Sequence, residues 1–403
     1  MSPLHAPPSH RSTNPIVSRA VGPDANLILV SRSCMPASDS VASLRSAGRT
    51  PLLFTVSMGL EDVVVREFRE RAAAADLTVT DTDDAPFGLQ SYALVEVEAD
   101  PDAALGVARQ MRSVHHVLAP LYTFTLPDDG EAALQTIRDT VEALDVGAMG
   151  DANTFRATTV RQGDHDFSSM DVQRVAGGGL DARYDAAVDL EDYDVEVRVD
   201  VHDDRCLVSV QHTQEALSRR QLVGYQPRAA LKANVAYALL RLAHLDTPPD
   251  PLLDPFCGSG TILLEAADLW PETQCYGNDW DEEAVAGART NVEHAGLTNR
   301  ITIREGDVWH LAETFDDVAA DLVVTNPPFG VRMASSMDFF PFYRRVLGQM
   351  ATVLRPGGTV VILVLRQGPF NAAIRETETF TICHVRAIEI GGLYPYVFVL
   401  ETT

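Results

Sequence analysis

The sequence contains a single lysine, Lys232, although lysine and arginine together make up 32 residues. Its formal net charge is −25 and its pI is about 4.7. Two explanations fit this composition equally well. One is an acidic, halophilic surface adapted to a cytoplasm rich in salt, and the other is a GC-rich genome, which favours arginine codons. In either case, contact with a polyanion requires a local cluster of basic residues, because the chain as a whole carries the wrong charge.

Cysteine is also scarce, and long apolar runs are absent. The five cysteines are scattered and odd in number, which argues against a disulfide framework and against a zinc site. We therefore expect free thiols, a cytoplasmic location and no bound metal. No apolar run reaches the roughly 18 residues that a membrane span requires, so we expect no membrane partner.

The N-terminal part of the sequence divides into a tail and a first folded unit. Residues 1–50 hold five arginines and two aspartates among many serines and prolines, which predicts a disordered tail. Regular patterns then predict a strand at 52–57, a helix, a strand at 91–99 and a helix at 101–114. This alternation predicts a small α+β ferredoxin-like domain over residues 51–119.

A second unit follows at residues 120–215. The patterns predict two helices and three strands, at 131–144, 154–162, 168–184, 194–202 and 205–213. Serines that can cap a helix precede the segment at 168–184, and its three consecutive glycines, Gly177 to Gly179, weaken that helix by up to about 1 kcal/mol each. Residues 216–227 then read as a linker.

The third region, residues 228–403, predicts an α/β domain. After a helix at 228–245, five apolar strands alternate with helices, which is typical of a doubly wound parallel sheet. Two further strand patterns, at 380–390 and 394–402, have no helix between them. One of these two strands should therefore run antiparallel to the rest.

Polar and glycine motifs follow four of these strands. Gly258 and Gly260 lie between a strand and a helix, where the backbone can approach a ligand closely. Asp279 ends the second strand, where a carboxylate can bind ribose hydroxyls, and Asp307 ends the third, within reach of an adenine amino group. Plainer interpretations exist for each of these motifs. In two of them, for example, Asp281 can simply cap a helix and Cys257 can simply be a packing residue.

The fourth strand runs into "TNPPFG", residues 325–330. Taken alone, this segment is a turn that ends a strand. Together with "DPFCGSGT", "GNDWDEE" and "EGDVWHL", however, it resembles the ordered motifs of Rossmann-like, S-adenosylmethionine-dependent amino-methyltransferases. Segments within 120–215, among them "TFRATTVRQGDHDF", resemble a THUMP domain. The end of the chain, "GGLYPYVFVLE", resembles bacterial and archaeal tRNA guanosine-N2-methyltransferases that act on nucleotide 6.

The resemblance implies a cofactor, a substrate and a set of binding residues. The cofactor is S-adenosyl-L-methionine, and the substrate is the exocyclic N2 amino group of a guanosine in the acceptor stem of tRNA. The implied cofactor-binding residues are Asp254, Phe256, Gly258, Ser259, Gly260, Thr261, Asp279, Asp307 and Asn326.

The carboxamide of Asn326 has a specific chemical use in such an enzyme. An exocyclic amino nitrogen is a poor nucleophile, because its lone pair is delocalised into the base. The side-chain oxygen of Asn326 and the backbone carbonyl of Pro327 can each accept one of its N–H protons, and Phe329 can stack on the base. Asn326, Pro327 and Phe329 are therefore the predicted catalytic residues. The same motif occurs in adenine-N6 and glutamine amide methyltransferases, so the motif does not select the substrate.

RNA contact is expected at the linker. Between residues 205 and 245 there are six basic residues and one acidic residue, Glu215. The predicted RNA-binding residues are Arg219, Arg220, Arg228 and Lys232. His115, His116 and His165 are interpreted as ordinary surface residues.

The expected partner is the acceptor stem and 3′ end of tRNA, with no DNA partner, and the expected state is a monomer. Three alternatives remain. They are a 23S rRNA guanine-N2-methyltransferase, a DNA or protein amide methyltransferase, and a non-catalytic RNA-binding protein.

Overall fold

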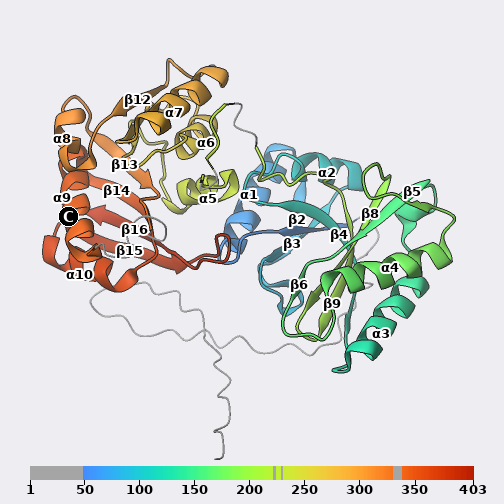
Figure 1. Ribbon diagram of the computed structural model, residues 1–403. Coiled ribbons are helices and arrows are strands. Elements are labelled where there is room, and N and C mark those ends of the chain that lie inside the picture. The colour runs from blue at the N-terminus through green and yellow to red at the C-terminus, as the bar shows by residue number, and fades with distance from the viewer. Residues whose placement is uncertain (1–48, 221–223, 228–229, 330–337) are drawn as a thin grey trace, which may run out of the picture.

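The computed structural model describes residues 49–220, 224–227, 230–329 and 338–403. These residues form two β-sheets in two lobes, an N-terminal lobe and a C-terminal lobe (Figure 1). Nearly all of the predicted tail and the whole of Arg228 lie outside the described residues. Within the described part of the chain, no helix has the length and apolar character needed to cross a membrane.

The first part of the N-terminal lobe has the β-α-β-β-α-β element order of a ferredoxin-like unit. Its elements are β1 (Thr50–Thr55), α1 (Glu61–Ala74), β2 (Thr78–Asp83), β3 (Tyr92–Glu98), α2 (Pro101–Ala108) and β4 (His116–Thr125). The strands pair antiparallel in the order β2-β3-β1-β4. The predicted unit is therefore present, with two strands, β2 and β4, that the sequence patterns did not reveal.

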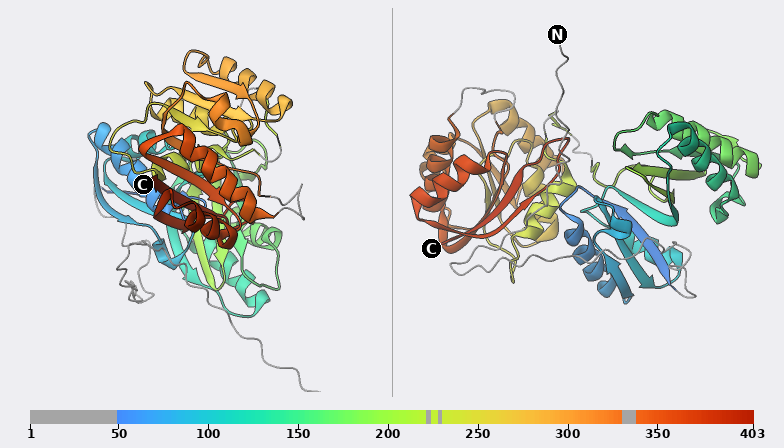
Figure 2. Two further views of the ribbon diagram at one scale, coloured as in Figure 1. Left: turned by 90° about the vertical axis from the view of Figure 1, so that its left-hand side faces the viewer. Right: turned by 90° about the horizontal axis from the view of Figure 1, so that it is seen from below.

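The second part of the lobe extends the same sheet. Its elements are α3 (Gly130–Ala143), β5 (Thr154–Thr158), β6 (Arg161–Gln162), α4 (Ser169–Arg183), β7 (Ala187–Val188), β8 (Val195–His202) and β9 (Arg205–Gln211). Strand β9 pairs antiparallel with β4, so the sheet has nine strands. Figure 2, seen from below, shows the two parts (blue and green) side by side. The expected division between residues 119 and 120 falls inside β4, and the domain boundaries stay a prediction.

Local signals in this second part place its elements as expected. Ser168 and Asp171 form a reciprocal capping box at the start of α4, which satisfies two backbone N–H groups. Strands β8 and β9 form the predicted hairpin, with His202 opposite Arg205 across the two-residue turn. Valines on β8 and β9 contribute to the core beneath α3 and α4.

The C-terminal lobe is the predicted doubly wound sheet. Its elements are α5 (Ala233–Leu242), β10 (Leu252–Asp254), α6 (Thr261–Leu269), β11 (Cys275–Asp279), α7 (Glu282–His294), β12 (Ile301–Glu305), α8 (Leu311–Thr314), β13 (Ala320–Thr325), α9 (Phe339–Val353), β14 (Leu354–Val364), α10 (Gln367–Thr377), β15 (Phe380–Ala387) and β16 (Tyr396–Thr402). Its strand order is β12-β11-β10-β13-β14-β16-β15. Strand β16 runs antiparallel to both of its neighbours, which confirms the expected reversal.

The order of the strands locates the ligand crevice. From β10 the chain proceeds outward to β11 and β12, and it then returns to the other side of β10 as β13. Ligands in open α/β sheets bind at such a switch point, beyond the carboxyl ends of the strands. The motifs after β10, β11, β12 and β13 all lie at that edge.

The two lobes also touch at the end of β15. Arg386 donates to the carboxylate of Asp62 at 2.6 Å and to the Gly59 carbonyl at 3.0 Å, and the backbone N–H of Glu389 donates to the Met58 carbonyl. Strand β15 of the C-terminal lobe is therefore bonded directly to the start of α1.

Gly179 of α4 supports a stability prediction, because a Cβ atom there would lie 2.7 Å from the Arg138 carbonyl oxygen of α3. At Gly177 the nearest atom would be the Ala157 Cβ, at 3.9 Å, an ordinary contact. We expect Gly179→Ala to lower the unfolding temperature, because the helices must separate. Gly177→Ala should leave it unchanged or raise it, since alanine favours a helix interior by up to about 1 kcal/mol. Thermal unfolding followed by circular dichroism checks the pair, and equal shifts would contradict the packing explanation.

Candidate active site

The loop between β10 and α6 exposes its backbone as the motif predicts. Gly258 and Gly260 have φ angles of 50° and 80°, in the left-handed region that favours glycine. An added Cβ at Gly258 would meet no described atom within 4 Å, so the loop faces open space. No described side chain caps the N-terminus of α6. Its free N–H groups suit an anionic group such as the carboxylate of S-adenosylmethionine.

Asp279 lies directly against this loop. Its Oδ2 accepts a hydrogen bond from the Gly258 backbone N–H at 2.9 Å, and its Oδ1 accepts one from the Asp281 N–H at 3.1 Å. Asp281 itself caps α7 by accepting from the Glu283 N–H. The plainer interpretation therefore holds for Asp281, whereas Asp279 lies beside the glycine loop and its contact with ribose hydroxyls stays a prediction.

Asp307 follows β12 at the same edge of the sheet, and its side chain is exposed. Its Oδ1 accepts from the Trp309 N–H at 3.0 Å and so begins a short 3-10 helix. Contact with an adenine amino group stays a prediction for this residue. Nearby Asn278 ties the crevice together, because its Nδ2 donates to the carbonyls of Pro255 and Gly306. The sequence patterns did not single out Asn278.

Asp254 hydrogen-bonds both to the glycine loop after β10 and to the end of β13. Its side chain is 1% exposed, and its Oδ1 accepts from the Thr325 hydroxyl at 2.7 Å and from the Phe256 N–H at 3.1 Å. Burial raises the pKa of this carboxyl to about 7, and the charge of Asp279 adds to the rise. Asp254 thus joins the glycine loop after β10 to the last residue of β13.

The remaining residues of the predicted cofactor set pack around the same loop. Phe256 is half-buried, with its ring centroid 6.3 Å from that of Phe342. Ser259 and Thr261 are buried, and their hydroxyl oxygens lie 3.1 Å apart. Cys257 is buried in the core, as its packing interpretation predicts.

Asn326 directly follows Thr325, and its side-chain oxygen is unusual. Its Oδ1 is buried and has no hydrogen-bond partner among the described residues. A buried acceptor without a donor costs about 1–3 kcal/mol, and such atoms in native proteins call for an explanation. Pro327 is buried and Phe329 is half-buried against the core, while Gly330 lies outside the described residues. The oxygen is therefore available to a donor from outside the described residues.

The predicted RNA-binding residues lie in different environments. Arg219 and Lys232 are exposed, and their side chains form no ion pair with the described residues. Arg220 is instead turned inward, donating to Glu265 Oε1 at 2.8 Å and to backbone carbonyls. Arg228 lies outside the described residues. We therefore keep RNA contact as a proposal for Arg219 and Lys232 and assign Arg220 to the junction between the lobes.

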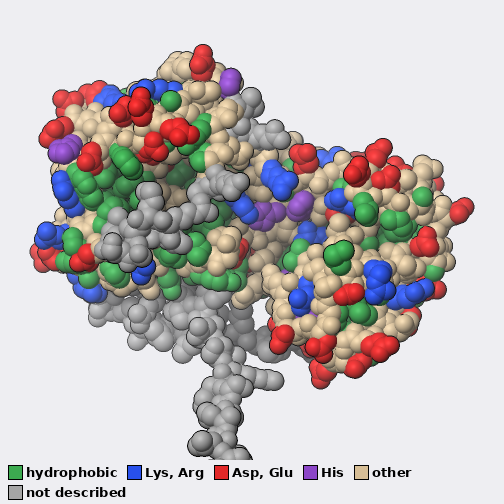
Figure 3. Space-filling view, viewed as in Figure 1, with side chains coloured by type: hydrophobic (Ala, Val, Ile, Leu, Met, Phe, Trp, Pro, Cys, Tyr) green, Lys and Arg blue, Asp and Glu red, His purple; other side chains and the backbone are tan. Residues whose placement is uncertain are grey.

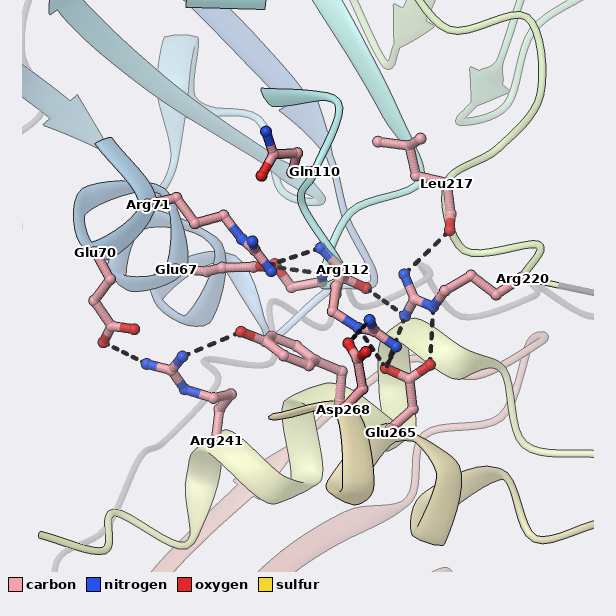
Figure 4. A network of polar contacts seen from close by, with 12 residues as sticks. Glu67, Glu70, Arg71, Gln110, Arg112, Leu217, Arg220, Arg241, Glu265 and Asp268 are labelled. Atoms are coloured by element: carbon pink, nitrogen blue, oxygen red, sulfur yellow. Dashed lines mark hydrogen bonds and ion pairs between the residues drawn. The ribbon is translucent and has the colours of Figure 1, made fainter. Parts of the chain in front are cut away.

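Arg220 belongs to a charged network that connects the lobes (Figure 4). Glu265 of α6 also accepts from Arg112 of the N-terminal lobe at 2.9 Å, and Arg112 pairs with Asp268 as well. The backbone of Arg112 is held by Glu67 of α1, which accepts from its N–H at 2.9 Å. No motif marked these residues, although Glu265 could have been noticed as a carboxylate inside an apolar helix.

A large cavity opens beside this network. It has a volume of about 1130 Å³ and is lined by both lobes and by the junction. Its Lys and Arg lining residues are Arg112, Arg198, Arg219, Arg220, Lys232 and Arg300. Four histidines but only three acidic residues also line it. Figure 3 shows Lys, Arg and His side chains gathered where the lobes meet, whereas acidic side chains and further basic ones are spread over the outer surfaces.

Two of those histidines are not the ordinary surface residues expected from the sequence. His115 is half-buried, with Nδ1 2.8 Å from the Ser218 hydroxyl and Nε2 3.3 Å from that of Ser57. Burial lowers its pKa to about 4, helped by the charge of Lys232. His116 is also half-buried and bonds to Thr213.

The raised pKa of Asp254 predicts a pH dependence of stability. The folded chain binds this proton more tightly than the unfolded chain, where the pKa is near 3.8. Stability is therefore lost as pH rises from about 4 to about 7. Asp254→Asn keeps an oxygen acceptor but cannot ionise. We expect it to unfold at a higher temperature than the wild type above pH 7, with the difference narrowing toward pH 4. Calorimetry across this range checks it, and a difference independent of pH would contradict it.

Comparisons with known proteins agree with this arrangement. A family model described as the RMKL-like methyltransferase domain matches residues 220–395, and a THUMP domain model matches residues 131–211. The crystal structure of TrmN from Thermus thermophilus matches with a TM-score of 0.69 at 33% identity, covering 88% of this chain and 99% of that chain. The expected fold class, a Rossmann-like methyltransferase domain preceded by THUMP, is confirmed.

Two curated relatives extend the comparison. The Thermus thermophilus protein named tRNA (guanine(6)-N2)-methyltransferase is 37% identical over 296 residues, which are 72% of this chain and 84% of that protein. The mouse protein named tRNA (guanine(6)-N(2))-methyltransferase THUMP3 is 32% identical over 62% of this chain. The match covers 51% of the mouse protein, so this chain spans about half the length of that relative. With a THUMP domain, an RMKL-like methyltransferase domain and this degree of identity, the chain belongs to the family of S-adenosylmethionine-dependent THUMP methyltransferases that includes the Thermus enzyme.

Proposed function

We propose that this enzyme methylates the exocyclic N2 amino group of a guanosine in tRNA, at nucleotide 6 of the acceptor stem. The observation that carries the proposal is the buried Oδ1 of Asn326, just after β13, which has no hydrogen-bond partner among the described residues. It lies at the sheet edge that also carries the glycine loop and Asp279. S-adenosyl-L-methionine, when bound, supplies an electrophilic methyl group at that edge.

The role of the chain is to hold the amino group. The nitrogen must become more tetrahedral to act as a nucleophile, and this form is stabilised when both N–H protons meet acceptors. Asn326 Oδ1 and the Pro327 carbonyl are neutral acceptors, so neither requires a change of protonation. Pro327 and Pro328 fix the backbone φ angle, which holds these acceptors in position before the substrate arrives.

Asn326 is in turn positioned by the hydrogen bond of its neighbour Thr325. The hydroxyl of the preceding residue, Thr325, donates to the buried carboxylate of Asp254, whose strand leads into the glycine loop. One hydrogen bond therefore links the segment for the base to the segment for the cofactor. Phe329 is the proposed stacking surface for the base.

The names of the relatives support tRNA over the rRNA alternative. The Thermus and mouse proteins are both named for guanine 6 of tRNA. A non-catalytic RNA-binding protein would have no need for a buried oxygen left open to a donor. Neither a DNA nor a protein substrate would explain the THUMP domain.

The proposed selection of nucleotide 6 depends on distance. The THUMP domain is the proposed grip on the 3′ end, and the basic cavity is the proposed path of the acceptor stem towards the crevice. The Glu265 network fixes how far apart these regions lie. Readout of bases along the stem is not needed, since the A-form major groove is too deep and narrow for side chains. A cytoplasmic monomer remains the expected setting, and a salt-rich cytoplasm remains one of the two explanations for the acidic composition.

Removal of the Asn326 carboxamide tests its assigned role. We expect Asn326→Ala to reduce methyl transfer more than tenfold, because one acceptor for the amino group is lost. Binding of S-adenosylmethionine, measured by calorimetry, should stay nearly unchanged, since the side chain faces the nucleophile. Turnover within tenfold of the wild type would remove Asn326 from the mechanism.

The substrate itself is tested with paired transcripts. We expect a tRNA transcript with guanosine at position 6 to gain one methyl group there, located by mass spectrometry of nuclease fragments. An otherwise identical transcript with inosine at position 6 lacks the N2 amino group and should gain none. Methylation of both transcripts at equal rates, or of 23S rRNA fragments in preference to tRNA, would overturn the proposal.

A further inference from the structure

A single buried side chain bridges the junction and the cofactor loop. Asn291 of α7 is 2% exposed. Its Oδ1 accepts from the Tyr225 backbone N–H at 2.9 Å, and its Nδ2 donates to the Tyr225 carbonyl at 2.8 Å. The same Nδ2 donates to the carbonyl of Ser259, in the glycine loop, at 3.0 Å. Asn291 thus bonds to both backbone groups of one residue in the linker and to one carbonyl of the glycine loop.

Close packing fixes the linker on the same helix. A Cβ atom at Gly287 of α7 would lie 2.2 Å from the ring of Tyr225, so the ring occupies the space that the glycine leaves. At Gly224 an added Cβ would lie 2.7 Å from Asn291 Oδ1. Burial raises the pKa of Tyr225, and the charges of Glu283, Asp281 and Asp279 raise it further.

Asn291 also borders the basic cavity. The cavity is lined by Asn291 and Thr261 together with Gln226 of the linker, and Arg219 and Lys232 lie along it on either side of Gln226 in sequence. Asn291 therefore lies at the border of the proposed RNA path and also donates to the glycine loop. Among the described side chains, Asn291 bonds to the linker and to the glycine loop at once.

We propose that Asn291 couples the two substrates, so that tRNA in the basic cavity and the cofactor at the glycine loop strengthen each other's binding. This inference rests on the proposed function, because it takes tRNA as the occupant of the cavity. Asn291 acts as a positioning residue and contacts neither reacting atom.

The sign of the coupling follows from the geometry. RNA that contacts Arg219 and Lys232 favours the linker in its docked place on α7, and docking holds the Asn291 amide towards Ser259. Cofactor contacts favour the same loop arrangement. Two ligands that favour one arrangement must favour each other, and by the same factor in both directions.

Two variants break this connection from opposite sides. Asn291→Asp keeps the acceptor for the Tyr225 N–H but loses both donated hydrogen bonds, including the one to Ser259. Gly287→Ala leaves every hydrogen-bonding group in place and displaces the Tyr225 ring instead. Alanine also favours the helix, so loss of folding is not the expected outcome. Glu293→Ala, an exposed change on the same helix, is the matched control.

The experiment measures the affinity for S-adenosyl-L-homocysteine, which carries no transferable methyl group, by calorimetry with and without saturating tRNA. For the wild type and Glu293→Ala we expect tRNA to tighten this affinity by about fivefold or more, the lower end of common coupling factors. For Asn291→Asp and Gly287→Ala we expect the ratio to approach one, while the affinity without tRNA changes less. The affinity for tRNA, measured by fluorescence anisotropy with and without S-adenosyl-L-homocysteine, should change by the same factor.

The outcomes separate this inference from the proposed function. If tRNA neither binds nor is methylated, the proposed function fails. If tRNA binds and is methylated but the wild-type ratio is one, the coupling proposal is overturned. It is also overturned if the wild-type ratio persists in both Asn291→Asp and Gly287→Ala. Unfolding temperatures close to that of the wild type confirm that each variant is folded.

Discussion

The arrangement of the whole enzyme depends on one buried carboxylate, Glu265, where the two lobes meet. It accepts hydrogen bonds from Arg112 of the N-terminal lobe and from Arg220 of the linker, and it belongs to the helix that begins at the glycine loop. If one member of such a group is removed, its partner is left as a buried charge with neither water nor a counter-charge. That loss destabilises the protein by more than the intact group stabilises it. The network therefore favours a single spacing between the lobes over a range of spacings, which the proposed path for RNA requires.

The proposed chemistry depends on residues that the parallel sheet brings to one edge. Parallel strands bring the ends of β10, β11, β12 and β13 to one edge, so residues far apart in sequence meet without any long loop. Asp254 and Thr325 connect the ends of β10 and β13, and Asn278 of β11 bonds to the segments that follow β10 and β12. The segments proposed to bind the two substrates are thus hydrogen-bonded to each other and not only packed against the core.

Sequence reasoning found the parts that local patterns encode. Apolar strands followed by Gly258, Asp279 and Asn326 were recognisable because periodicity and motif coincide there. Strand β2 was missed because it is polar and half-exposed at a sheet edge, and β4 because Pro120 and a register shift interrupt its pattern. Arg220 was assigned to RNA because a sequence cannot show which basic residues meet a carboxylate inside the fold. Asn291 lacked any signal, and Glu265 offered only that of a carboxylate inside an apolar helix, since the importance of both arises only when distant segments pack together.

The single lysine of the chain has a consequence for labelling chemistry. Lys232 is exposed at the start of α5 and lines the basic cavity. Reagents that acylate side-chain amines therefore have one target in this enzyme, and that target lies on the proposed RNA path. Among the side chains, an amine-reactive fluorophore or cross-linker would therefore label this cavity alone. The natural sequence thus already provides a single lysine target, and no substitution is needed to create it.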